Sequence, residues 1–207
     1  MTNKILRSLA NPDRFVEAIR RFDEANAQDP NLEIVGGKPM PRELAYAQRL
    51  TAWVLKLNPD ASEILLLAAR SQHLCRWTIP RSDYELTRAG YLRWRNDLKK
   101  FHADKAGRIL QEVGYPPEVI REVQALNLKQ NFPKDPQGRI LEDALCLVFL
   151  EHQFADLARK TSEDKMINAV QKTWNKMTPS ARLEAMKLPY GDAEKALLTK
   201  ALAPIQS

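Results

Sequence analysis

Two segments of the 207-residue sequence combine histidine with arginine and aromatic residues, which are side chains used to bind and transform anions. In the first segment, RSQHLCRW, an interval of three separates Arg70, His73 and Arg76, so a helix would place them on one side, with Trp77 one turn beyond His73. Guanidinium groups bind phosphate and carboxylate through paired hydrogen bonds. A lone histidine at the end of a core helix is more often structural, but the two flanking arginines favour a binding site.

The second segment is YLRWRNDLKKFHADK. Helical spacing places Tyr91, Arg95, Leu98 and His102 on one face, with the apolar rings of Trp94 and Phe101 on a neighbouring stripe. A core helix whose basic side chains extend to solvent explains the apolar positions equally well. His102 and the acid two residues later are a weaker, additional indication of acid–base or metal chemistry.

A third candidate is the pair Glu142 and Asp143, at the head of an apolar segment. Acidic residues are favoured in the first turn of any helix. Asp143, however, shares a side with apolar residues that should face inward, and a buried carboxylate needs a cation or a metal. With His73 and His102 it would supply two imidazoles and a carboxylate, a set suited to a divalent transition metal with open positions.

Positive charge is concentrated in the same part of the chain. The sequence has 32 Lys and Arg against 26 Asp and Glu, a net charge of +6. Residues 70–108 hold ten basic and four acidic side chains, so they account for the whole excess. Such a segment attracts anions, although a solvated basic face would look the same. It also contains five aromatic residues, Trp77, Tyr84, Tyr91, Trp94 and Phe101, which together with the basic residues could contact nucleic acid.

Helical signals recur along the whole chain, and no pair of strands with a tight turn is evident. We expect an all-α single domain of residues 1–207, a bundle of about eight helices, with a core at 11–178 and a C-terminal helical extension at 179–203. Asn11-Pro12 is expected to open the first helix, and Thr87, Ser162, Thr178 and Asp192 are candidate N-caps. The expected helices cover 11–25, 41–57, 62–77, 87–113, 117–128, 139–159, 162–177, 179–187 and 192–202, and the most buried are 63–76 and 140–154.

Composition narrows the compartment and the class of protein. With 44% hydrophobic and 28% charged residues, the chain is neither disordered nor fibrous. It has no secretory signal and no apolar run long enough to span a bilayer, so we expect a cytoplasmic protein with no membrane association. Cys75 and Cys146 lie far apart in apolar patterns, which indicates reduced thiols. Phosphate-loop, dinucleotide-binding and serine-hydrolase motifs are absent.

The segments AARSQHLCRWTIPR, GYLRWRNDLKKFHADKA, LEDALCLVFLEHQFADL and KTWNKM resemble the family catalogued as domain of unknown function 4202, from about residue 10 to 178. This resemblance implies no activity. More distantly, the order of elements resembles that of the HD-type metal-dependent phosphohydrolases, all-helical domains with His, His-Asp and Asp ligands. In that resemblance Asp143 is the last ligand and Glu43 stands where the first histidine is expected, whereas His73 is followed by Leu74 instead of Asp. Either His102 compensates, or the domain binds an anion without a metal.

The leading hypothesis is therefore an HD-like hydrolase or lyase acting on a phosphorylated or other anionic small molecule. His73, His102 and Asp143 would be catalytic and, with Glu43, would bind a divalent metal ion, unless one histidine acts as a metal-free general base. The substrate-binding side chains would be Arg70, Arg76, Trp77, Arg81, Arg93 and Arg95. The alternative is a basic helical module that binds nucleotide or RNA without catalysis. A helical adaptor without a ligand would leave the His and Arg clusters unexplained.

Overall fold

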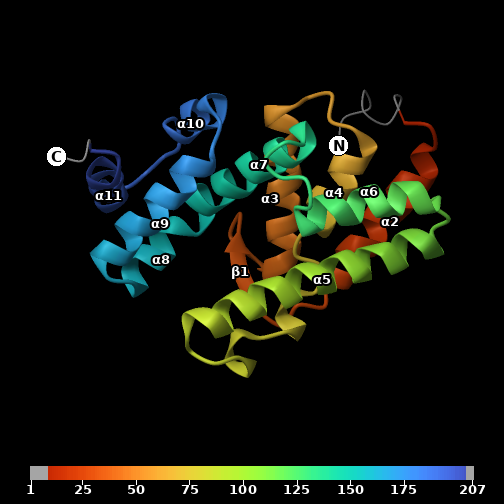
Figure 1. The fold of residues 1–207 in the computed structure, drawn as a ribbon, viewed down its shortest axis with the longest axis horizontal. Helices are drawn as coiled ribbons and strands as arrows, with labels where there is room; N and C mark the ends of the chain where they lie inside the picture. The colour runs from red at the N-terminus through yellow and green to blue at the C-terminus, as the bar shows by residue number, and fades with distance from the viewer. Residues whose placement is uncertain (1–8, 204–207) are drawn as a thin grey trace. The chain divides into compact units, whose positions relative to one another are not determined.

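The computed structural model describes residues 9–203 and confirms the all-α class (Figure 1). This part of the chain contains ten α-helices, two short 3-10 turns and one two-stranded hairpin. It divides into two compact units, Met1–Gly138 and Arg139–Ser207, which are described separately here. Because compactness alone does not show that a unit folds independently, the single-domain organisation stays a prediction.

The described part of the first unit contains five α-helices, two 3-10 turns and one hairpin. Its elements are α2 (Pro12–Asn26), β1 (Leu32–Val35), β2 (Lys38–Pro41), α3 (Arg42–Leu57), α4 (Glu63–Ser71), the 3-10 turns η1 (Arg76–Thr78) and η2 (Arg81–Asp83), α5 (Arg88–Glu112) and α6 (Pro117–Leu128). The predicted N-cap Thr87 is confirmed, because its side chain accepts a hydrogen bond from the backbone N–H of Gly90. The side chains of Asn11 and Ser62 cap their helices in the same way and accept from the backbone N–H groups of Arg14 and Leu65.

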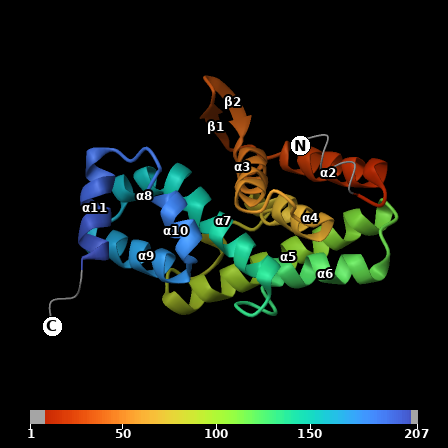
Figure 2. The same cartoon turned by 90° about the horizontal axis from the view of Figure 1, so that it is seen from above.

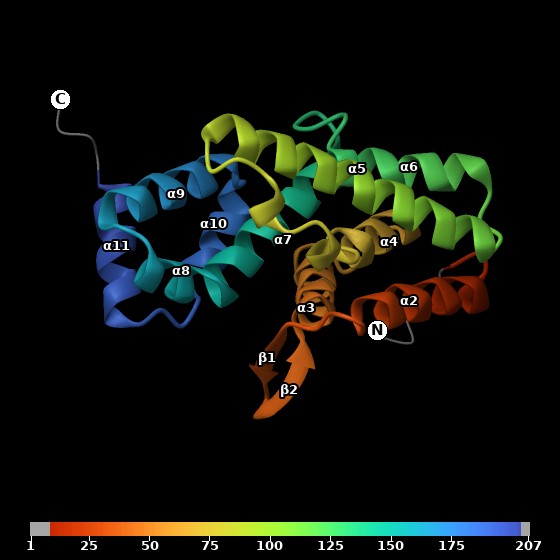
Figure 3. The same cartoon turned by 90° about the horizontal axis from the view of Figure 1, so that it is seen from below.

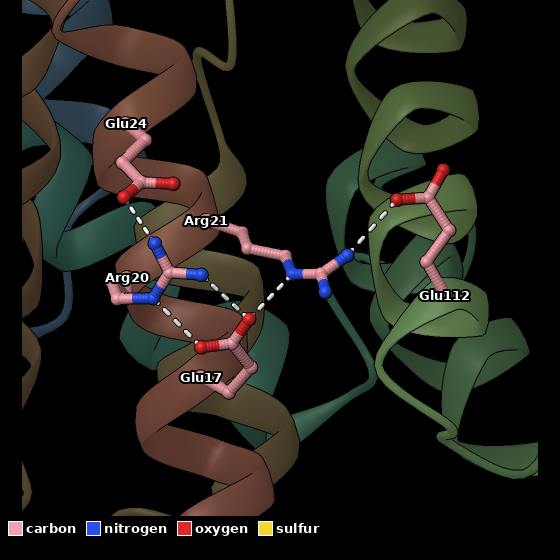
Figure 4. Close-up of polar contacts among 5 residues, drawn as sticks. All are labelled: Glu17, Arg20, Arg21, Glu24 and Glu112. Atoms are coloured by element: carbon pink, nitrogen blue, oxygen red, sulfur yellow. Dashed lines mark hydrogen bonds and ion pairs between the residues drawn. The ribbon is translucent and has the colours of Figure 1, made fainter.

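Helix α2 packs its apolar stripe inward and exposes an ion-pair network. Phe15, Ala18 and Phe22 have no exposed surface. On the outer face, Arg20 pairs with Glu17 and Glu24, and Arg21 bridges Glu17 to Glu112 of α5 (Figure 4). The arginines lower the pKa of Glu17 to about 2, through the hydrogen bond from Arg20 first and that from Arg21 next. These exposed pairs connect two helices that are distant in sequence.

The hairpin corrects the expectation that no strands would form. Gly36 and Gly37 have φ values of 56° and 79°, as a two-residue turn between strands requires, and Val35 faces Lys38 across the turn. Because β2 contains Pro39 and Pro41, the sequence of this segment was interpreted as a loop. Figure 2 shows the hairpin projecting from the start of α3, so it determines where that helix begins.

Helix α4 is buried as predicted but shorter than predicted. Its residues Leu65 to Ala69 have no exposed surface. The helix ends at Ser71 instead of continuing to about residue 77, and Cys75 adopts a left-handed conformation with φ 54°. The backbone N–H of Cys75 donates to Oδ1 of the fully buried Asn26 at 2.9 Å, so a tertiary contact stabilises this turn. Arg70, His73 and Arg76 therefore do not lie along one helical face, and that prediction is wrong.

Helices α5 and α6 form an antiparallel pair (Figure 3). Their close approach depends on Gly107, because a Cβ atom there would lie 2.4 Å from Nε2 of Gln124. Gly114, with φ 85°, follows the last turn of α5, and Tyr115 in the connection is buried. The long helix α5 is thus held in place by a neighbouring helix along its second half.

The second unit is formed by most of α7 and the helices that follow it. The helices are α7 (Pro136–His152), α8 (Phe154–Lys160), α9 (Glu163–Lys176), α10 (Pro179–Ala185) and α11 (Asp192–Leu202). The single helix predicted at 139–159 is interrupted at Gln153, and the N-cap of α11 is Gly191 instead of Asp192. Residues 141–144 of α7 are all buried, in agreement with the prediction for 140–154. Within residues 9–203, no helix is both long and apolar enough to cross a bilayer.

Candidate acid–base and anion site

The first unit brings Glu43, Tyr46, His73 and His102 together from three separate segments. Glu43 lies in the first turn of α3, and its backbone N–H donates to Oδ2 of the buried Asp29 at 3.0 Å. The other oxygen of Asp29 accepts from the backbone and side-chain amides of Asn31, at 2.9 and 2.8 Å. The aspartate thus anchors the beginning of α3, and with it the position of Glu43.

His73 is held between an aromatic ring and a carboxyl group. Its ring stacks on that of Tyr46, with centroids 4.0 Å apart and planes 9° from parallel. Its Nδ1 atom lies 3.3 Å from Oε2 of Glu43, and the side chains of His73 and Glu43 are only 18% and 10% exposed. Burial, reinforced by the positive charges of Arg76, Arg95 and Lys129, holds the pKa of His73 well below its usual 6.5. His73 is therefore a neutral imidazole at physiological pH.

His102, on α5, is the second imidazole of the site. Its ring centroid lies 5.8 Å from that of His73, and its Nδ1 lies 2.9 Å from the backbone oxygen of Leu74. Burial, with a further contribution from His73, lowers the pKa of His102 to about 3. A neutral imidazole can contact a carbonyl oxygen only by donating, so Nδ1 carries the proton and Nε2 keeps its lone pair. The Nε2 atom is thus the one available to accept a proton or bind a metal.

Glu43 is the titrating group of this cluster. Burial raises its pKa from 4.5 to about 7, although the nearby positive charge of Arg76 acts in the opposite direction. Both protonation states are consequently populated near neutral pH. A carboxyl group with such a pKa can either donate or accept a proton, which is the requirement for general acid–base catalysis.

Two arginines lie close to the acid–base cluster. The guanidinium of Arg76, in η1, lies over the ring of Trp94, 4.6 Å from its centroid. Burial lowers the pKa of Arg76, and the positive charge of Arg95 lowers it further. Within residues 9–203, neither arginine forms an ion pair with a carboxylate. The two positive charges repel each other, and a bound anion would reduce that repulsion.

The other predicted substrate-binding residues have different contacts. Arg70 makes a paired interaction with Asp23, with both distances 2.6 Å. Arg81 donates to the backbone oxygens of Tyr84 and Glu85, at 2.9 and 2.6 Å, and so fixes the loop before α5. Arg93 pairs with the exposed Glu85 at 2.9 Å. Trp77 is half-buried in η1.

Asp143 and Glu142 belong to the second unit. Both oxygens of Asp143 accept hydrogen bonds from Thr178, one from the backbone N–H at 2.9 Å and one from the hydroxyl at 2.6 Å. Glu142 lies 3.3 Å from Nζ of Lys176. In the part of the chain that the structure describes, no three His, Cys, Asp or Glu side chains are arranged as a metal site. A shared metal at His73, His102, Asp143 and Glu43 remains a prediction.

The sequence reasoning missed Tyr46 and Asp29, and it considered Glu43 only as a metal ligand. A signal was available for Asp29, since an Asp followed two residues later by Asn can form a local side-chain turn. None was available for the stacking of Tyr46 on His73, because 27 residues and a helix–helix contact separate them.

Comparison with known proteins gives one match. No curated protein and no solved structure matches the chain. Residues 16–198 match the family described as "Domain of unknown function (DUF4202)", a range that includes every residue of the site just described. The chain therefore belongs to the DUF4202 family.

Proposed function

We propose that the first unit is an enzyme, a hydrolase or lyase that acts on a phosphorylated or other anionic small molecule. The observation that carries this proposal is the placement of Glu43. Its buried carboxyl group has a pKa near 7, contacts a neutral imidazole, and lies near the charge of Arg76. Folding disfavours burying such a group unless something compensates, so a cluster of this kind indicates a functional site.

Arg76 and Arg95 would bind the anionic part of the substrate. Their mutual repulsion, and the cost of burying Arg76, are both relieved when an anion binds between them. The planar guanidinium fork also matches the geometry of phosphate. The substrate's charge would thus be neutralised beside the group that transfers the proton.

For a phosphate ester the reaction balances with the groups present. The ionised carboxylate of Glu43 takes a proton from a water molecule whose oxygen forms the new bond to phosphorus. The bond to the leaving oxygen breaks with its electron pair remaining on that oxygen, and Glu43 returns the proton there. His73 orients the carboxyl group through its contact with Oε2.

A divalent metal would be a second way of activating the same water. His73, His102 and Glu43 would be its candidate ligands in the first unit, although no three such side chains among the described residues are arranged as a metal site. Nε2 of His102 keeps a free lone pair because Nδ1 donates to Leu74. A bound metal would lower the pKa of its water and polarise the phosphoryl group. Activity lost in EDTA and restored by Mn²⁺ would support the metal-assisted form, and activity unaffected by EDTA the metal-free form.

The binding test uses inorganic phosphate and isothermal titration calorimetry on the full chain. Because charge-assisted hydrogen bonds contribute roughly 1.5–3 kcal/mol, Arg76→Ala should weaken phosphate binding at least tenfold. The matched control is Lys100→Ala, an exposed cation of the same helix as Arg95, which should change the affinity less than twofold. Equal losses in both variants, with a steep dependence on salt, would contradict a focused site and favour the alternative, a nucleic-acid-binding module.

The chemical test uses p-nitrophenyl phosphate as the probe. Glu43→Gln removes the titrating proton while retaining the shape of the side chain, and should lower kcat by roughly 10²–10⁴-fold, the usual contribution of general acid–base catalysis. Phosphate affinity should be retained in this variant. Unchanged hydrolysis in Glu43→Gln would overturn the role proposed for Glu43.

A further inference from the structure

An exposed aromatic ring adjoins the proposed anion site. Tyr91, in the first turn of α5, is 46% exposed, whereas its neighbour Trp94 is only 7% exposed. The two ring centroids are 5.9 Å apart and the ring planes are inclined by 49°. Since Arg76 lies over the ring of Trp94, the exposed ring and the half-buried cation are both neighbours of the same indole.

One face of helix α5 carries three kinds of side chain, namely an aromatic ring, a cation and an imidazole. Tyr91 and Arg95 are four residues apart and therefore lie one turn apart on that face, with His102 two turns further along. At 1.5 Å per residue, the aromatic ring and the cation are displaced by about 6 Å along the axis. Exposure falls in the same direction, since Tyr91 is exposed, Arg95 is intermediate and His102 is 3% exposed. The face thus leads from an open aromatic ring, past a cation, to the buried imidazole.

We infer that the substrate carries a planar aromatic base joined to its anionic group, as in a nucleoside monophosphate, and that Tyr91 stacks on the base. This inference rests on the proposed function, because the phosphate must bind at Arg76 and Arg95. Stacking of a base on an aromatic side chain strengthens binding by roughly 5- to 150-fold, enough to determine which phosphate compounds bind. Tyr91 is then a specificity residue that takes no part in proton transfer.

A small nucleotide fits the charges around Tyr91 better than a nucleic-acid strand does. The exposed cation Arg93 is already paired with Glu85, and Asp83 adds an exposed negative charge in the same loop. A strand needs several phosphate contacts along a positive track. Among the described residues, Arg76 and Arg95 form no ion pair with a carboxylate, which suits binding of one terminal phosphate.

The experiment compares adenosine 5′-monophosphate with inorganic phosphate, by titration calorimetry at constant ionic strength. The wild-type protein should bind the nucleotide at least tenfold more tightly than phosphate. Tyr91→Ala should remove most of that difference and leave phosphate affinity unchanged, whereas Tyr91→Phe should retain it, because stacking needs the ring and not the hydroxyl. The matched control is Leu92→Ala, an adjacent residue that is 55% exposed, which should change neither affinity more than twofold.

The outcomes separate this inference from the function on which it rests. Phosphate binding that depends on Arg76, combined with nucleotide binding no tighter than that of phosphate, would overturn the inference and leave the proposed function intact. An equal effect of Tyr91→Ala and Leu92→Ala on the nucleotide would overturn it as well. Absence of phosphate binding by the wild-type protein would contradict the proposed function itself. If a single-stranded oligonucleotide bound far more tightly than the nucleotide, the inferred ligand would be nucleic acid instead of a small molecule.

Discussion

Two buried carboxyl groups, one in each unit, have opposite surroundings. Asp143 in the second unit is 4% exposed, and both of its oxygens accept hydrogen bonds from Thr178 at the start of α10. Glu43 in the first unit is 8% exposed, but its neighbours are a neutral imidazole and the positive charge of Arg76, and burial raises its pKa to about 7. A buried acid whose oxygens accept hydrogen bonds stabilises a fold, whereas one whose pKa is raised by burial is retained at a cost that function can explain.

The largest loss of stability should come from removing the carboxylate of Asp143, whose two oxygens both accept hydrogen bonds. Asp143→Ala deletes two hydrogen bonds to a charged acceptor and leaves the backbone N–H of Thr178 without this partner. At roughly 1.5–3 kcal/mol for each such bond, the free energy of unfolding should fall by about 3–6 kcal/mol, as measured by urea denaturation. Asp143→Asn, which keeps one acceptor oxygen, should lie between the wild type and the alanine variant.

The same variants test whether Asp143 belongs to the functional site. A folded Asp143→Asn protein should bind inorganic phosphate with wild-type affinity, because the carboxylate is engaged by Thr178. Loss of phosphate or metal binding with little change in stability would instead make Asp143 a ligand, and the contrast with Glu43 would disappear.

Replacing the carboxyl group of Glu43 should change the free energy of unfolding with the opposite sign. The pKa of Glu43 is about 7 in the folded protein and 4.5 in its ordinary state, so the folded state retains a proton that the unfolded chain loses. The free energy of unfolding contributed by this group therefore falls as the pH rises from 4.5 through 7. Glu43→Gln abolishes this decline, and at pH 8 it should be more stable than the wild type by about 3 kcal/mol, since one unit of pKa corresponds to 1.36 kcal/mol.

The measurement is the difference between wild-type and Glu43→Gln unfolding free energies at pH 4.5, 6 and 8. The lowered pKa values of His73 and His102 make both proteins less stable as the pH falls below 6.5. This histidine contribution is common to the two proteins and cancels in the difference. A difference that is independent of pH would show that Glu43 titrates normally, and would remove the main support for its catalytic role.

The helices were predictable where local chemistry determines them. Thr87 caps α5 and Gly114 follows its end, so its bounds could be placed within two residues and the shared face of Tyr91, Arg95 and His102 followed from the spacing. Where a distant residue determines the structure, prediction failed. Helix α4 ends early at a turn that Asn26 stabilises from α2, which no pattern within residues 62–77 could indicate.

The residues of the candidate site were likewise predictable only in part. Its cations and histidines were recognised by type, because clustered charge is visible in a sequence. Glu43 was recognised only as a candidate metal ligand and Tyr46 was missed, since both reach His73 only through the packing of α3 against the turn after α4. The hairpin was also missed, although the two glycines at its turn were visible, because prolines in β2 are unusual in a strand.

The smallest effect should come from a carboxylate that is neither buried nor functional. Glu112 is 64% exposed and lies 3.2 Å from Arg21 (Figure 4). Arg21 keeps its 2.7 Å contact with Glu17 when Glu112 is removed, so no cation is left without a partner. Glu112→Ala should therefore lower the free energy of unfolding by less than about 0.5 kcal/mol, as is usual for exposed ion pairs, and the loss should shrink further in 1 M salt. A loss as large as that of Asp143→Ala would mean that contact with a cation stabilises a carboxylate regardless of burial, and the contrast between Asp143 and Glu43 would then need another cause.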